Sequence, residues 1–230
     1  MIHVPPGTAP EPGPAWLAST TFLDHDTPRV NAFATAATTG AAGDIERAAR
    51  LFYAVRDRYR YDPFAVTLDP ADYVASTVES RAAAYCIPKA VLLAAAARAV
   101  GIPAGIGLAD VVNHLTTDKL KARMGGSTLF VDHGYAVLFL EGRWVKAAPA
   151  FNIELCERFH VRPTEFDGRT DAVFQEFDAL DRRHMEYVRE HGVWSDLPFD
   201  RIAEDFRKAY PPELYTPTDE RFEDGAPVRG

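Results

Sequence analysis

The 230-residue chain is poor in several features that identify common protein classes. It has only two cysteines, which excludes a disulfide framework as its main source of stability. Its longest apolar run, residues 90–97, is much shorter than the roughly 20 residues that a membrane-spanning helix needs. With 25 Lys and Arg against 33 Asp and Glu, the formal net charge of −8 argues against nucleic-acid binding. We therefore expect neither a membrane nor a nucleic acid as a partner.

The usual signatures of targeting, catalysis and metal binding are missing too. The N-terminus has neither the basic nor the apolar segment of a secretory signal, so a cytoplasmic protein is expected. No GxSxG, HExxH, CxxC or P-loop motif occurs. His184 and His191 lie two turns apart in a stretch, 177–191, that predicts an amphipathic helix, and this spacing does not suit a metal. We expect neither a metal site nor a cofactor.

The chain does contain enough apolar material for a folded core, because 47% of its residues are hydrophobic. Residues 1–14 include five prolines and predict a flexible arm. Residues 15–212 predict a single domain, and residues 213–230 predict a polar tail.

Apolar spacing predicts further helices. The first spans 44–61 and ends before the next proline. The second spans about 87–100, with Pro88 in its first turn and an alanine-rich body. The third spans 199–209. Together with the helix predicted over 177–191, it gives two extra C-terminal helices.

Between these helices, the pattern of apolar residues is typical of β-strands. Residues 104–112 predict one strand, and 130–140 and 143–149 predict two more that are joined by a tight turn at residues 141–142. The stretch 115–128 predicts a loop with a helical piece. Helices, then strands, then helices indicate an α+β domain.

Cys86 is the first candidate for chemistry. It stands at the start of the predicted helix 87–100, where unpaired N–H groups and the helix dipole stabilise a thiolate and can also hold an oxyanion. The alternative is a small buried residue with no chemical role, which is the more common fate of a lone cysteine.

The predicted hairpin adds a possible base. A two-residue turn places His133 opposite Ala150, with Ala148 and Asn152 as its diagonal neighbours on the same face. A Cys nucleophile, a His base and an Asn that orients the ring form the triad of thiol acyl transfer. The alternatives are an ordinary strand histidine and a turn asparagine.

In order and spacing, these features resemble the transglutaminase-like superfamily, whose core is papain-like. The resemblance rests on a Cys that opens a helix ending in RAVGIPA (residues 86–104), on the later strand His133 and GRWV motif, and on the preceding YRYDP (residues 59–63). It covers residues 45–152, which would form the core, with 153–212 as a helical extension. It implies a Cys-bearing helix packed on an antiparallel sheet, with Cys86 as nucleophile and His133 as general base.

The sequence departs from the superfamily where its third catalytic residue is expected. Members usually have Asp-Pro at the end of the strand after the histidine, and here Ala148 precedes the proline. Either Asn152 replaces the acid or the site is weakened or lost, and we favour Asn152. Asp132 is a poor substitute, because a strand neighbour of His133 should point to the opposite face.

Other residues are candidates for substrate or oxyanion contacts, although each is more often structural. They are Tyr85, Tyr135 and the polar pair Asn113 and His114. The loop 118–126 could cover the cleft as a flap or be a solvated loop.

We interpret the chain as a cysteine hydrolase that cleaves an amide or ester bond in a peptide or small amide, and the enzyme assignment itself stays open. The main alternative is a binding or scaffold protein that keeps the fold after its active site has decayed. A protein-crosslinking transferase is a third possibility.

Overall fold

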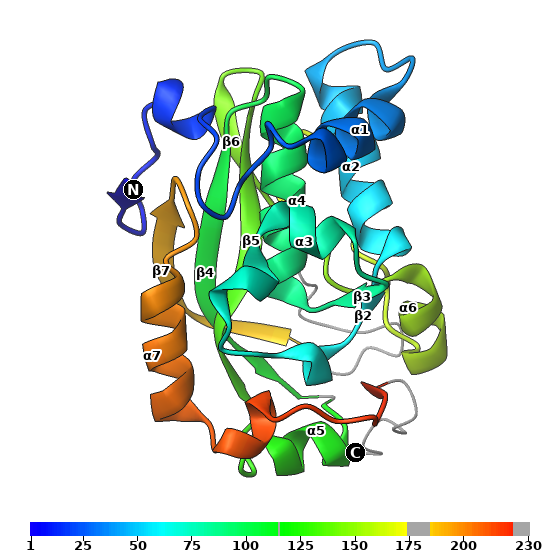
Figure 1. The fold of residues 1–230 in the computed structure, drawn as a ribbon, viewed down its shortest axis with the longest axis vertical. Coiled ribbons are helices and arrows are strands. Elements are labelled where there is room, and N and C mark those ends of the chain that lie inside the picture. The colour runs from blue at the N-terminus through cyan, green and yellow to red at the C-terminus, as the bar shows by residue number, and fades with distance from the viewer. Residues whose placement is uncertain (115, 174–184, 223–230) are drawn as a thin grey trace.

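The computed structural model describes residues 1–114, 116–173 and 185–222, which form a sheet with helices packed on it (Figure 1). The five strands of this sheet are antiparallel and follow the order β1-β7-β4-β5-β6. They are β1 (His3–Val4), β4 (Ala104–Asn113), β5 (Leu129–Leu140), β6 (Arg143–Ala147) and β7 (Met185–Trp194). A separate parallel pair consists of β2 (Arg60–Tyr61) and β3 (Ala83–Ala84). The predicted α+β class, with a Cys-bearing helix packed on an antiparallel sheet, is confirmed.

Helices from both halves of the chain surround this sheet. They are α1 (Pro28–Thr38), α2 (Asp44–Arg58), α3 (Ala75–Glu79), α4 (Cys86–Ala99), α5 (Asp118–Arg123), α6 (Ile153–Phe159) and α7 (Phe199–Ala209). Short 3-10 turns are η1 (Pro14–Trp16), η2 (Pro63–Ala65), η3 (Pro70–Tyr73) and η4 (Pro212–Tyr215). In the described part of the chain, no helix is both long and apolar enough to cross a membrane.

The central element is α4, which lies between β5 and the group formed by α1, α2 and α3 (Figure 1). Its residues from Cys86 to Arg98 are all buried. Because so many of them are alanines, neighbouring elements can pack closely on every side of the helix. Gly101, with a φ of +85°, follows the end of the helix as predicted.

The hairpin of β5 and β6 has the predicted register. Leu140 pairs with Arg143 and Ala136 with Ala147, so residues 141–142 form the turn. Glu141 and Gly142 both have positive φ, +48° and +80°, as a type I′ turn requires. However, β6 ends at Ala147, two residues earlier than predicted, because Pro149 follows and cannot donate a ladder hydrogen bond.

The prediction of a helix over 177–191 is wrong in its described part. Residues 185–191 belong to β7, and residues 174–184 lie outside the described residues. Strand β7 pairs with β4 on one side and β1 on the other, so neighbouring strands satisfy its backbone groups. This pairing outweighs the helix propensity of its charged side chains. The predicted helical extension over 153–212 therefore also supplies a strand to the sheet.

Local boundaries differ from the predictions in the first half of the chain as well. The helix predicted over 44–61 ends at Arg58, and Arg60 and Tyr61 form β2. The sequence does not predict α1, because its apolar face is narrow: only Val30, Phe33 and Ala34 are buried. The residues between β2 and α4, for which no element is predicted, contain β3, α3 and two 3-10 turns.

Residues 1–14 and the described part of the predicted polar tail both contact the rest of the fold. The arm over 1–14 is not separate from the sheet, because His3 and Val4 pair with β7 and the Trp144 indole N–H donates to Pro10 O at 2.7 Å. In the predicted polar tail, Leu214 and Phe222 are buried. A few apolar side chains within polar segments are enough to hold both to the core.

Candidate active site

Cys86 is the first residue of α4, where the sequence predicts it. Its side chain is 6% exposed, and the backbone N–H groups of Cys86, Ile87 and Gly134 face its sulfur. N–H groups at a helix N-terminus favour negative charge on a thiolate or on a substrate oxygen. The sulfur is therefore placed beside the donors that thiol acyl transfer needs.

Gly134 brings β5 close to the start of α4. A Cβ added at this position would lie 2.9 Å from the Cα of Ile87, closer than real side chains come. Only glycine allows this approach, which lets the Gly134 N–H reach the Cys86 sulfur. Sequence analysis missed this contribution, although HGY stands in the motif that carries the resemblance.

Burial opposes charge on the thiol. It raises the pKa of Cys86 to about 12, although the N–H groups of Gly134, Ile87 and Cys86 act in the opposite direction. Cys86 is therefore a protonated thiol at neutral pH in this conformation, and a base is needed to activate it.

His133 lies on β5, beside Ala109 of β4. Its side chain is 3% exposed, and burial lowers the pKa of the imidazole to about 3, so the ring is neutral at neutral pH. The ring meets Tyr187 of β7 edge to face, with centroids 6.4 Å apart. The neutral form is the one that can accept a proton as a general base, but a pKa this low makes the ring a weak base in this conformation.

Cys86 and His133 line the same cavity, together with Tyr61 and Tyr85. Among the hydrogen bonds of the described residues, none joins the Cys86 thiol to the His133 ring. Such contacts are often long before substrate binds and shorten afterwards. The structure thus brings the predicted nucleophile and base to one site as two neutral groups.

The predicted role of Asn152 as the partner of His133 does not agree with the structure. The Asn152 amide oxygen accepts from Tyr61 N at 2.9 Å, and its nitrogen donates to Glu154 Oε2 at 2.7 Å. Its backbone caps α6. Because β6 ends at Ala147, the chain has left the sheet before it reaches position 152, so the diagonal pairing with His133 does not form.

Of the other candidates, only Tyr85 lines the cavity. The Tyr135 ring lies against Gly107 in a small cluster with Ala109, and neither Tyr135 nor Ala109 lines the cavity. Asn113 is buried at the end of β4, and His114 binds Glu186 Oε2 at 3.3 Å outside the cavity. Sequence proximity placed these residues near the cleft, but their positions on the strands keep them away from it.

The order of the elements around Cys86 and His133 has a counterpart in a known family. A sequence model of the transglutaminase-like superfamily matches residues 31–149, slightly more than half of the chain. The chain belongs to the transglutaminase-like superfamily. No curated protein matches it. A solved structure from Cytophaga hutchinsonii, described as a candidate cysteine protease, is similar at a TM-score of 0.46 and 14% identity, covering 78% of this chain and 53% of that one. The chain thus spans about half of that protein.

Within the superfamily, this chain departs at Ala148, where the resemblance leads us to expect an acid. Ala148 is buried in the cluster with Tyr135 and Ala109. Its methyl group offers the imidazole no hydrogen bond. Position 148 therefore supplies neither a carboxylate nor an amide to the site in this superfamily member.

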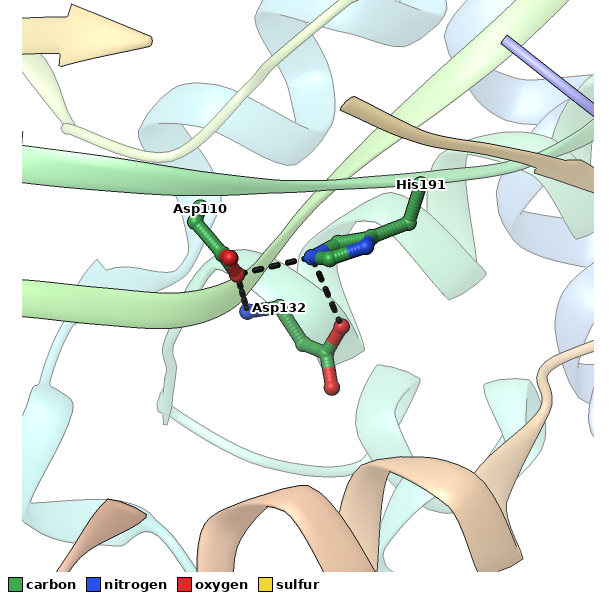
Figure 2. Close-up of side chains that lie close together, drawn as sticks. All are labelled: Asp110, Asp132 and His191. Atoms are coloured by element: carbon green, nitrogen blue, oxygen red, sulfur yellow. Dashed lines mark hydrogen bonds and ion pairs between the residues drawn. The ribbon is translucent and has the colours of Figure 1, made fainter. Parts of the chain in front are cut away.

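Sequence analysis also missed a polar cluster directly before His133. Asp110 Oδ1 accepts from the backbone N–H of Asp132 at 3.1 Å and from His191 Nε2 at 2.8 Å (Figure 2). Asp132 has a left-handed φ of +55°, and the β4–β5 register shifts here. The Asp110 carboxylate thus holds a β-bulge that sets where His133 and Gly134 lie. No local sequence signal marks a bulge of this kind.

By donor type, Asp110, Asp132 and His191 could hold a metal ion, since their ligand atoms lie within 4.8 Å of one another. However, Arg201 Nη2 lies 3.2 Å from Asp132 Oδ1 and already supplies a positive charge. Burial raises the pKa of Asp132 to about 6, although Arg201 and His191 lower it. Ion pairs and hydrogen bonds within the protein thus explain why these side chains lie together.

Proposed function

We propose that the protein is a cysteine hydrolase that cleaves an amide or ester bond through Cys86 and His133. The observation that carries the proposal is their placement: a helix-opening cysteine with three backbone N–H groups at its sulfur shares a cavity with a buried, neutral imidazole. Membership of the transglutaminase-like superfamily supports a thiol-dependent reaction of this general type.

In the proposed reaction, His133 takes the Cys86 thiol proton as the sulfur attacks the substrate carbonyl. The N–H groups at the start of α4 stabilise the oxyanion. The carbon–nitrogen or carbon–oxygen bond then breaks, and His133 gives its proton to the leaving group. Water, deprotonated by His133, hydrolyses the thioester and restores the thiol. The thiol and the ring must come into hydrogen-bond contact when substrate binds.

The first test separates acylation from deacylation with p-nitrophenyl acetate, an activated ester that needs little help to acylate a thiol. Wild type is expected to release nitrophenol continuously. His133→Ala is expected to deacylate about 10²–10⁴-fold more slowly, because it lacks the base that activates water. It should therefore accumulate acetylated Cys86, which mass spectrometry locates. His114→Ala, outside the cavity, is the matched control and should behave as wild type. Equal deacylation rates in wild type and His133→Ala would exclude His133 as the base.

The buried state of His133 predicts an unusual pH dependence. Its pKa is lowered to about 3, so the ring keeps its neutral, base form as the pH falls from 8 to 5. Deacylation at Cys86 should then be nearly constant over this range. An imidazole with an ordinary pKa near 6.5 would instead lose about 30-fold of its base form by pH 5. The rate of thioester hydrolysis, measured on pre-acylated enzyme, distinguishes the two profiles.

A second candidate function is binding without catalysis. It is favoured by the closed, neutral state of Cys86 and His133 and by Ala148 in place of the expected acid. A binding protein would show neither acylation of Cys86 nor turnover of the ester in the test above. A crosslinking transferase would instead transfer the acyl group to an added primary amine, which the same assay detects as an amide product.

A further inference from the structure

Resting on the proposed function, we propose that the site takes a short, uncharged, apolar acyl group next to Cys86. The apolar walls of the cavity beside the thiol include side chains from four segments that lie far apart in the sequence. They are α5 with Leu120 and Met124, α7 with Phe206, η4 with Leu214, and η2 with Pro63. None of these side chains offers a charge or a hydrogen bond, so the group that fills the space must be satisfied by apolar contact.

Of the three tyrosines at the cavity, Tyr85 and Tyr210 have hydroxyls that bind other groups of the protein. Tyr85 Oη lies 2.5 Å from Tyr73 Oη. Tyr210 Oη accepts from Val131 N at 2.6 Å and donates to Leu129 O at 3.0 Å. These hydroxyls hold α7 and the helical turns in place, and they are not available to a polar acyl group. A substrate hydroxyl or amide beside Tyr85 and Tyr210 would therefore lose its bonds to water without replacement.

A charged acyl group has no suitable partner either. His133 is held neutral by burial, and the Asp132 carboxylate is 3.2 Å from Arg201 Nη2. Among the described residues that line the cavity, Asp132 is the one carboxylate and no Lys or Arg occurs, so an anion would be repelled and a cation would compete with Arg201 for Asp132. Both would lose their hydration on entering an apolar space. The cavity therefore selects against either sign of charge.

The cavity is also small. Its volume is about 30 Å³, and Cys86 is 6% exposed. This space suits a few carbon atoms beyond the carbonyl. The side chains of Leu120 and Met124, which limit it on the α5 side, are 1% and 2% exposed. The segment that sequence analysis considered as a flap or a solvated loop thus forms a wall of the cavity.

The test labels Cys86 in the full chain with methanethiosulfonates, which convert a thiol to a mixed disulfide without needing catalysis. The reagents carry a neutral propyl, a cationic aminoethyl, an anionic sulfonatoethyl or a bulky benzyl group. Each rate at Cys86 is divided by the rate with free N-acetylcysteine, and mass spectrometry separates Cys86 from Cys156. The propyl reagent is expected to react at least tenfold faster than either charged reagent. Equal relative rates for the neutral and charged reagents would overturn the proposal.

A matched pair of variants tests the size of the cavity. Met124→Ala should accelerate labelling by the benzyl reagent several-fold, because it removes a wall. Met185→Ala removes an equally buried methionine of β7 that does not line the cavity, and it should leave the ratio of benzyl to propyl rates unchanged. The same shift of this ratio in both variants would indicate general loosening and refute the assignment of Met124.

These results are independent of hydrolysis. If the protein prefers the propyl reagent but does not turn over p-nitrophenyl acetate, the apolar cavity is supported and the proposed function is refuted. If the protein hydrolyses the ester but reacts equally with all reagents, the proposed function is supported and the proposed acyl specificity is refuted.

Discussion

Cys86→Ala is expected to abolish the release of nitrophenol from p-nitrophenyl acetate above the buffer rate, a loss of about 10⁴-fold or more in turnover. The reason is that the nucleophile acts together with its base and the oxyanion donors, so that little catalysis remains without it. The alanine methyl group fits where the Cβ of cysteine stands, and α4 is already rich in buried alanines. The fold should therefore survive, and the loss would be chemical.

The second cysteine provides the matched control. Cys156 lies on α6 with its sulfur 3.9 Å from Phe151 O, it is buried, and burial raises its pKa to about 11. Cys156→Ala should keep full turnover, since Cys156 does not line the cavity of Cys86. If Cys86→Ala retained turnover, or if both variants lost it equally, the thiol of Cys86 would not be the nucleophile.

The sequence was sufficient to predict the features of the site that depend on local pattern. The start of α4 at Cys86 follows from helix propensity and from the proline in its first turn. The β5–β6 register follows from a two-residue turn with positive φ at both positions. These two elements, with the spacing between Cys86 and His133, carried the assignment to the superfamily.

What the sequence did not predict depends on contacts between distant segments. β7 is a strand because β4 and β1 pair with it, not because of its own charge pattern. Asn152 was assigned to His133 by extending a register that stops at Ala147, and in the structure its amide binds Tyr61 and Glu154 instead. The bulge at Asp132 requires Asp110, which no local rule connects to it.

Lys89 is a further case of a residue defined by distant partners. It lies one turn after Cys86 and is fully buried, and its ammonium donates to Arg56 O at 2.8 Å, Tyr59 O at 2.7 Å and Ala150 O at 2.7 Å. Burial lowers its pKa to about 7, whereas three carbonyl acceptors match the three N–H groups of the charged form. The first two carbonyls belong to the end of α2, where the helix dipole favours a cation.

Lys89→Met is expected to lower the free energy of unfolding by about 3–5 kcal/mol, one of the largest losses for a single substitution in this chain. Methionine fills a similar volume but leaves three buried carbonyls without donors. The loss should appear as a lower denaturation midpoint in urea, with an unchanged dependence on urea concentration. It should also reduce ester turnover, because Lys89 ties the first turn of α4 to α2 and to the loop after β6.

Lys119→Met is the matched control, since Lys119 is about half exposed and its one ion pair, with Glu220, spans 3.6 Å. Its effect should stay within about 0.5 kcal/mol, as is usual for exposed positions. A similarly small effect for Lys89→Met would mean that water or backbone movement satisfies the three carbonyls. The ammonium would then not be what joins α2, α4 and the loop that carries Ala150, and the orientation of Cys86 would depend on apolar packing alone.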